Sequence, residues 1–316
     1  MLVLLACACT VVGAAHPRLR ITPRIAMVAK APAFGVQARD IQAERYVAQN
    51  RFRVKRGREA AFEKRWAERR SRLGLLDGFR FFCMMRRTET FDGAAFEDDV
   101  NYISTTVWEN FEAYGAWKKG DAFKEAHGGG TLGGVASMLM ATARNTKGKP
   151  KTAMWEGLLP VSMPAAASAG AGDGWREVFA DGEAQLDGEC FLAMNRFSVL
   201  PGKAAAFEER FASRESTLSS FKGFKGFVLL RRDGKADDGF THSTWSVWKD
   251  RAAFAEWKES ASRPPGPRDY DDQPETPNPP AAGTAQPADG APRLFARPPV
   301  PAFFEGILVL ESANGV

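Results

Sequence analysis

The run Asn-Arg-Phe occurs twice in this chain of 316 residues, at 50–52 and again at 195–197. Further identical residues follow at the same offset of 145 positions: Gly57 and Gly202, Phe62-Glu63 and Phe207-Glu208, Arg65 and Arg210, Arg69 and Arg214, Gly78-Phe79 and Gly223-Phe224, and Arg86-Arg87 and Arg231-Arg232. So many matches at one offset indicate a duplication, and a duplication decides the architecture before any single residue does.

The match continues after a shorter loop changes the offset to 140. Trp108 and Trp117 then correspond to Trp248 and Trp257, and Glu-Gly at 156–157 recurs near the end of the chain. The chain is therefore two copies of one module in tandem.

The spacing of apolar residues predicts the same order of elements in each copy, β-α-β-β-α-α-β. In the first copy, strands are expected at 46–54, 79–85, 102–108 and 154–161, and helices at 58–75, 109–127 and 131–144. This order is ferredoxin-like, and a lone sheet of that kind leaves one face uncovered. We therefore expect an α+β protein in which the two modules pack sheet to sheet and close one α/β barrel within the chain.

Composition sets the boundaries of the modules. The first module is expected at 45–161 and the second at 186–312, joined by a linker at 162–185 that is rich in Ala, Ser and Gly. Residues 263–301 hold 12 of the 19 prolines of the chain, which predicts a disordered insertion inside the second module.

The N-terminal segment has a different character. Residues 1–39 contain no Asp or Glu but five Lys or Arg residues, which favours an organelle transit peptide over 1–40. The apolar run at 2–15 leaves a secretory signal as the alternative. A chloroplast is the expected location, with the mitochondrion or the secretory pathway as alternatives.

Charge and composition exclude several classes of function. The net charge of +5 comes largely from the N-terminal segment, and the body has no dense basic stripe that would favour nucleic acid. No apolar run is long enough to span a membrane. Outside the N-terminal segment only Cys83 and Cys190 remain, too few for a disulfide framework or a zinc site.

Histidine is scarce, and its three positions are the main candidates for chemistry. His16 lies in the N-terminal segment and His242 in a predicted strand, whereas His127 ends a predicted helix. Taken alone, His127 is typical of a helix C-cap, and the alternative is a ligand for a metal or for haem iron. On one continuous helix, Trp117 would lie about 15 Å along the axis and about 80° around it from His127. Such a pair suits a large planar ligand better than a small metal ion.

The residues of the first copy together carry a family resemblance. They are Asn50-Arg51-Phe52, Gly57, Phe62-Glu63, Arg65-Trp66, Arg69, Gly78-Phe79, Trp108-Glu109, Trp117 and Ala126-His127. This pattern resembles the antibiotic biosynthesis monooxygenase (ABM) superfamily, and more specifically its IsdG-type haem-degrading branch. The resemblance covers 46–160 fully and 190–312 more weakly.

The resemblance implies a fold and a set of catalytic residues. Two ABM modules would form a dimeric α/β barrel, here within one chain, with haem between the helices and the sheet. His127 would be the proximal ligand of the haem iron. Asn50 would donate a hydrogen bond to iron-bound dioxygen, and Trp117 would press on the porphyrin and distort it.

The resemblance also implies binding residues and a reaction. Arg65 and Arg69 would pair with the haem propionates, and Trp66 would line the haem face. Haem would be both substrate and cofactor in an O2-dependent opening of the porphyrin ring that releases iron. Electrons would come from a separate donor, a reductase or a ferredoxin-type protein.

The second copy departs from this pattern. Asn195, Arg214 and Trp257 remain, but Phe211 replaces Trp66, and the position of His127 falls at Pro267. We therefore expect one haem per chain and a second copy that serves as scaffold. Two alternatives stay open: a cofactor-independent ABM oxygenase that acts on a quinol or a polyketide, and a haem-binding module without turnover.

Overall fold

The computed structural model describes residues 41–69, 72–127, 129, 131–163, 178–214, 216–260 and 293–312. The predicted transit peptide, most of the predicted linker and most of the predicted insertion lie outside the described residues. Within the described ranges, no helix combines the length and the apolar character needed to cross a membrane.

The first half contains the expected elements, and the described part of the second half contains them with a single helix between its last two strands. The first half consists of β1 (Arg45–Phe52), α1 (Glu59–Ala67), the 3-10 turn η1 (Leu73–Leu75), β2 (Phe79–Thr88), β3 (Tyr102–Trp108), α2 (Phe111–Lys119), α3 (Asp121–Ala126), α4 (Leu132–Asn145) and β4 (Lys151–Ser162). The second half consists of β5 (Cys190–Phe197), α5 (Ala204–Ala212), η2 (Leu218–Ser220), β6 (Phe224–Asp233), β7 (His242–Trp248), α6 (Arg251–Glu259) and β8 (Val300–Glu311).

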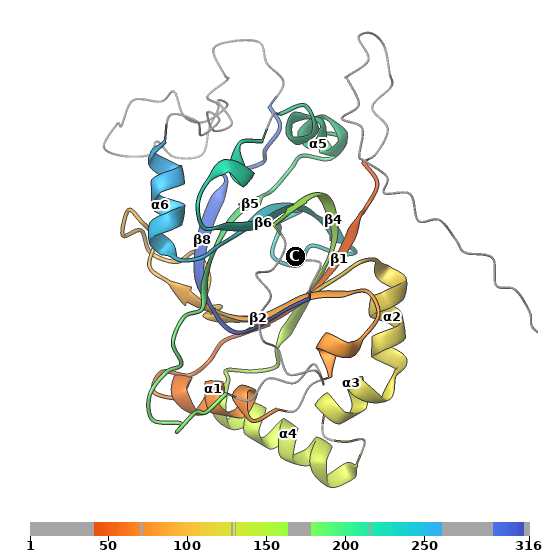
Figure 1. The fold of residues 1–316 in the computed structure, drawn as a ribbon, viewed down its shortest axis with the longest axis vertical. Helices are drawn as coiled ribbons and strands as arrows, with labels where there is room; N and C mark the ends of the chain where they lie inside the picture. The colour runs from red at the N-terminus through yellow and green to blue at the C-terminus, as the bar shows by residue number, and fades with distance from the viewer. Residues whose placement is uncertain are drawn as a thin grey trace, which may run out of the picture. The chain divides into compact units, whose positions relative to one another are not determined.

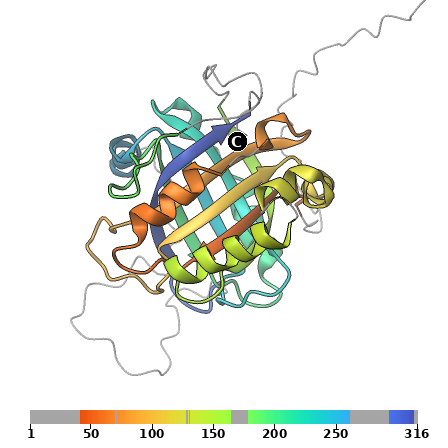
Figure 2. The ribbon, with the colours of Figure 1, turned by 90° about the horizontal axis from the view of Figure 1, so that it is seen from below.

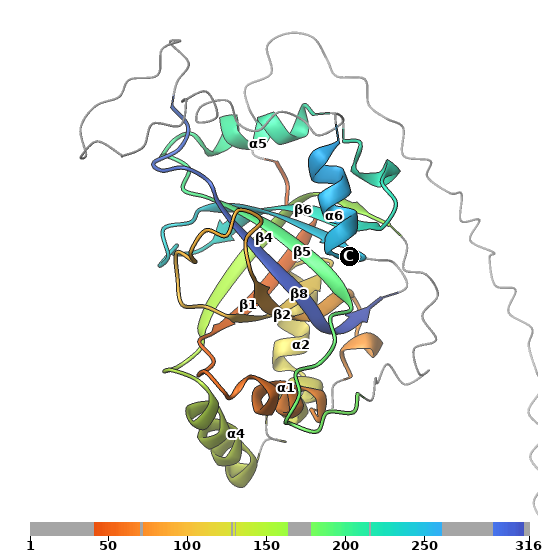
Figure 3. The same cartoon turned by 90° about the vertical axis from the view of Figure 1, so that its left-hand side faces the viewer.

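The strands form a closed antiparallel barrel in the order β1-β3-β2-β8-β5-β7-β6-β4 (Figure 1). The last strand of each half joins the halves, because β4 pairs with both β1 and β6, and β8 pairs with both β5 and β2. Helices α1, α2 and α4 lie over the outer face of the first half, and α5 and α6 lie on the opposite side of the barrel (Figures 2 and 3). The predicted intrachain barrel of two ferredoxin-like modules is confirmed.

Apolar side chains fill the barrel interior. Alternate residues of β2, such as Phe81 and Cys83, point inward and are fully buried, as a period of two along a strand requires. Cys83 and Cys190 are both free and buried. Gly306 of β8 lies against both sulfurs, and a Cβ at this position would collide with them. A glycine is therefore needed where the two cysteines meet the strand.

One of the predicted helices is broken. The segment 109–127 forms α2 and α3, and Gly120 between them has an extended backbone with φ of −81° and ψ of 170°. Glycine loses more conformational entropy in a helix than other residues, so a break is inexpensive there. The predicted helix at 58–75 likewise ends at Ala67 and resumes only as η1.

Part of the predicted disordered insertion belongs to the fold. Leu294 and Phe295 are buried, Phe295 forms a β-bridge with Val199, and β8 begins at Val300. The predicted insertion, 263–301, therefore extends too far toward the C-terminus. Its proline-rich end contains two buried apolar residues and the start of β8. Residues 261–292 lie outside the described part of the chain.

A buried carboxylate on the first helix of each half connects elements from both halves. Glu63 of α1 pairs with Arg86 of β2 at 3.0 Å, and Arg86 also pairs with Glu305 of β8 at 2.6 Å. The second half repeats the arrangement with Glu208, Arg231 and Glu156, at 3.0 and 2.7 Å. These residues are among those that repeat in the sequence, so the duplication preserved a set of ion pairs between the halves.

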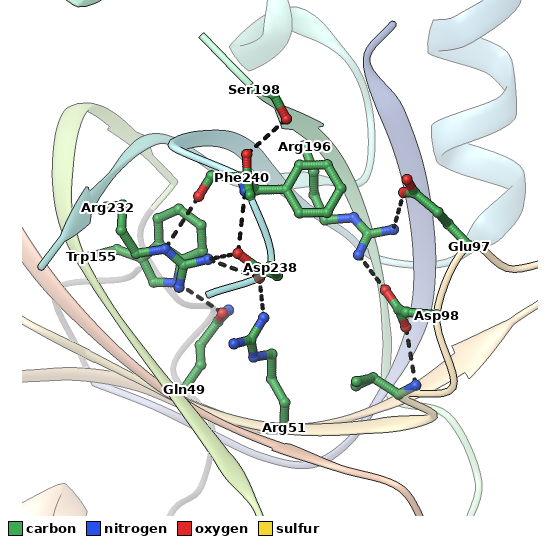
Figure 4. Close-up of polar contacts among 12 residues, drawn as sticks. Gln49, Arg51, Glu97, Asp98, Trp155, Arg196, Ser198, Arg232, Asp238 and Phe240 are labelled. Carbon is green, nitrogen blue, oxygen red and sulfur yellow. Dashed lines mark hydrogen bonds and ion pairs between the residues drawn. The ribbon is translucent and has the colours of Figure 1, made fainter. Parts of the chain in front are cut away.

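A second reciprocal set of ion pairs joins the halves near the loops that precede β3 and β7 (Figure 4). Asp98 lies between Arg87 of its own half and Arg196 of β5, at 2.5 Å from each. The equivalent set in the other half is Asp238 with Arg232 and Arg51. Each half thus supplies a carboxylate that binds an arginine of the other half.

Candidate active site

A cavity of about 280 Å³ lies between the outer face of the first sheet and the helices that cover it. Its floor comes from β1, β2, β3, β4 and β8, and its walls come from α1, α2 and α3. Five of the six residues singled out in the sequence line this cavity: Asn50, Trp66, Arg69, Trp117 and His127. Arg65 lies on α1 outside the lining. The fold therefore brings together residues that are up to 77 positions apart in the chain.

His127 is held as a neutral imidazole whose Nε2 lone pair faces Arg69. It follows the last residue of α3, and its Nδ1 lies 2.7 Å from the carbonyl oxygen of Phe123. Because a carbonyl can only accept, Nδ1 carries the proton and Nε2 presents its lone pair. Burial lowers the pKa of His127, and the nearby Arg69 lowers it further, whereas the Phe123 carbonyl opposes them. A neutral imidazole whose other nitrogen donates to a carbonyl is the usual form of a histidine ligand to a metal.

Arg69 is a buried cation that faces this imidazole. Its Nη2 lies 3.1 Å from Nε2 of His127, and its guanidinium lies 4.7 Å from the centre of the Trp66 ring. Burial, and to a smaller extent the charge of Arg65, lower the pKa of Arg69 to about 10. Among the described residues no carboxylate forms an ion pair with Arg69. A buried guanidinium without a carboxylate favours an anionic ligand in the cavity.

Aromatic rings form one wall of the cavity. Trp117 stacks on the buried Trp108 at 5.2 Å and contacts Phe123 edge to face at 5.0 Å. Phe123 stacks in turn on the imidazole of His127 at 3.9 Å. The ring centres of Trp117 and His127 are only 6.3 Å apart, much closer than one continuous helix would allow. The break at Gly120 is what brings them together.

The floor of the cavity is polar. Asn50 is half-buried on β1, and its side-chain amide donates a hydrogen bond to the hydroxyl of Ser104 at 3.3 Å. Ser104, Thr106 and Thr152 also line the floor. The site residues predicted from the sequence include neither these hydroxyl residues nor Phe123. Ser104 and Thr106 are two positions apart on β3 and therefore share a face of the sheet, which was the signal that could have identified the floor.

Comparison with known proteins gives a family for both halves of the chain. The model of the family described as antibiotic biosynthesis monooxygenase matches residues 45–129 and 190–263. No curated protein matches the sequence. The two matched segments correspond to the two copies of the repeat.

Solved structures resemble the chain over most of its length. A chain from Fusobacterium nucleatum subsp. nucleatum, provisionally named a monooxygenase, is 11% identical, and the match covers 87% of this chain and 97% of that one with a TM-score of 0.51. A chain from Lactobacillus acidophilus with the same provisional name is 8% identical, and the match covers 86% and 98% with a TM-score of 0.49. At these identities the likeness concerns the fold alone.

Proposed function

The chain belongs to the antibiotic biosynthesis monooxygenase family, and from that premise we propose that it is a haem-degrading monooxygenase with its active site in the first half. One observation carries the proposal: the imidazole of His127 is half-buried, neutral and oriented by the Phe123 carbonyl, so that Nε2 is the potential ligand atom in a cavity. Family membership alone supports the coarser statement that the chain is a monooxygenase, an oxidoreductase.

The residues around the cavity fit a planar dianion with a metal at its centre. Nε2 of His127 would bind the iron, and Arg69 would leave Nε2 to pair with a propionate. Trp66 and Trp117 would pack against the ring. Haem in this cavity would supply the redox-active iron for dioxygen chemistry, and its own ring would be the substrate.

The contacts of the other groups that surround the cavity support further roles in the proposed reaction. The Phe123 carbonyl holds the proton on Nδ1 and thereby keeps Nε2 as the ligand atom. Asn50 and Ser104 place hydrogen-bonding groups on the floor, across from the helices. The aromatic wall would exclude water once a ligand is bound, which would strengthen the electrostatic interactions inside the cavity. Reducing equivalents would come from a separate reductase or ferredoxin-type donor, and the chloroplast remains the proposed location.

A titration with hemin tests the first part of the proposal. Wild-type protein is expected to bind one hemin per chain through His127, recognised by a shifted Soret band. His127→Ala is expected to weaken binding by more than about tenfold because it removes the iron ligand. Lys124→Ala, on the same short helix but at an exposed position, is the matched control and is expected to bind as wild type. Equal binding by wild type and His127→Ala would refute the haem site and favour an oxygenase that needs no cofactor.

Adding a reductant and O2 to the haem complex tests the second part. A haem-degrading enzyme is expected to lose the Soret band and to release iron that a ferrous chelator captures. A stable Soret band with no released iron would instead indicate a haem-binding module without turnover.

A further inference from the structure

The second half contains a larger cavity than the first, at the equivalent place. It has a volume of about 610 Å³ and lies between the outer face of the second sheet and the helices α5 and α6. Phe91 and Asp92 from the loop after β2 complete its lining. The sequence predicts that the second half serves as a scaffold, and this role does not require a cavity of this size.

Residues that repeat in the sequence line both cavities. Asn195, Arg214, Trp257 and Lys258 occupy the positions of Asn50, Arg69, Trp117 and Lys118. Thr244 and Ser246 provide hydroxyl groups on the floor, as Ser104 and Thr106 do in the first cavity. The frame of a binding site is therefore present in both halves.

The second cavity differs in having no ligand for a metal among the described residues that line it. No histidine or cysteine contributes to that lining. Met194 contributes, but its side chain belongs to the barrel interior with Leu192, because neighbouring residues of a strand point to opposite faces. A molecule held here would be recognised by its shape and charge and not by coordination.

The walls of the second cavity select for a flat apolar molecule. Seven aromatic side chains line it: Phe91, Phe197, Phe211, Phe227, Phe254, Trp257 and Phe303. Aromatic rings bind flat apolar surfaces well, through offset stacking and edge contacts. A polar floor under aromatic walls also fits a ligand whose edge carries hydrogen-bonding groups.

Two cationic side chains line the second cavity, and they favour a ligand that carries negative charge. Arg214 is exposed at the cavity, and within the described ranges no carboxylate forms an ion pair with Arg214 or with Lys258. Lys258 Nζ lies 4.5 Å from the centre of the Phe91 ring. Asp92 is the one carboxylate of the described lining, and it already accepts a hydrogen bond from the backbone of Ala94. That hydrogen bond lowers the pKa of the Asp92 carboxyl, and the nearby Lys258 lowers it further, so the cavity presents two cations against one carboxylate and keeps an excess of positive charge.

We propose that this second cavity binds a planar, mostly apolar organic carboxylate without a coordinated metal, held between the aromatic walls and paired with Arg214 and Lys258. This site does not depend on the function proposed for the first cavity, because none of its residues takes part in that site.

Metal-free protoporphyrin IX, a planar dicarboxylate, is a direct probe. The full chain carrying Asn50→Trp, which fills the first cavity, is titrated while porphyrin fluorescence anisotropy is recorded. One porphyrin is expected to bind per chain. Adding Asn195→Trp should abolish binding, because Asn195 is an exposed strand residue facing the second cavity and a tryptophan suits such a position. Arg214→Ala or Lys258→Ala should weaken binding about tenfold each, as expected for a lost charge-assisted hydrogen bond.

Lys249→Ala is the matched control. It removes one positive charge just before α6 at a position that does not line the cavity, and binding should stay as in the Asn50→Trp parent. No porphyrin binding by the parent would overturn the proposal. So would equal binding after Asn195→Trp, or charge variants no weaker than the control. Arg214 and Lys258 lie at the cavity surface, so these variants decide the question even if Asn195→Trp fails to fold.

Discussion

Arg69 occupies the position beside His127 that a bound metal would take. Nη2 of Arg69 lies 3.1 Å from Nε2 of His127, at the atom where a metal would bind. A buried cation beside an imidazole disfavours the protonated ring, and burial disfavours it independently. The same contact that keeps the imidazole neutral must therefore open when a ligand reaches Nε2.

The protonation of His127 is open to direct measurement. Its pKa is lowered from the ordinary value of 6.5, first by burial and then by Arg69. An NMR titration of the imidazole is expected to give a midpoint below 6.5 in the wild type, and Arg69→Met should move it upward by removing the neighbouring charge. Because the folded pKa is the lower one, protonation of His127 costs stability as pH falls below 6.5. A midpoint that Arg69→Met leaves unchanged would contradict this account. Arg72→Met, an exposed arginine paired with Glu125, is the control.

Among the elements, the strands were easier to predict than the helices. The Thr and Ile content of 102–108 predicted β3 with its observed ends, because β-branched residues favour strands and the signal is visible in a short segment. The helix at 109–127 was mispredicted at Gly120, since the apolar spacing continues through the break. The distance between Trp117 and His127 was consequently overestimated, and the role of Phe123 in orienting the imidazole could not be foreseen.

The second cavity was also hidden from the sequence. The absence of a histidine at the counterpart of His127 predicts a second copy without that iron ligand, but it carries no information on the space that remains. Volume depends on how side chains from seven elements of the second half pack together with Phe91, which comes from a loop of the first half. Matching residues at a fixed offset identifies equivalent positions, but it does not predict the volume of the cavity that those residues line.

Glu63 joins more elements than any other carboxylate of α1. Its side chain is fully buried and accepts hydrogen bonds from Arg86 of β2, the Tyr102 hydroxyl of β3 and the backbone of Leu186. Glu63→Ala is expected to lower the free energy of unfolding by about 3–5 kcal/mol, because it removes one partner of Arg86 and leaves the Tyr102 hydroxyl and the Leu186 N–H without their shared acceptor. Glu68→Ala, an exposed residue one turn later, should change it by less than about 1 kcal/mol. Equal effects in urea unfolding would argue against the ion-pair network.

At the scale of the whole molecule, two reciprocal sets of ion pairs hold one half to the other. Asp98 binds Arg196 of the second half, and Asp238 binds Arg51 of the first. Burial by itself raises the pKa of both carboxyls, but the neighbouring arginines outweigh it and the pKa of each is lowered. The folded state therefore gains stability above the ordinary pKa of 3.8, and this gain is lost as pH falls through the lower, folded value.

This arrangement predicts how the barrel responds to acid. Asp98→Asn or Asp238→Asn should lower the free energy of unfolding at neutral pH by on the order of 1–3 kcal/mol. The difference from the wild type should shrink as pH falls below 3.8, where the wild-type carboxyls also become neutral. Asp237→Asn, at a largely exposed position, is the control and should have little effect at any pH. A deficit that is independent of pH would rule out the electrostatic explanation.

Closing the barrel with one polypeptide has a genetic consequence. In a barrel built from two identical subunits, every substitution appears in both sites at once, so neither site can change without the other. Here each position of β1 to β4 is encoded separately from its counterpart in β5 to β8. Selection can act on the two cavities one at a time, which explains how one lineage could keep His127 while its counterpart position became Pro267.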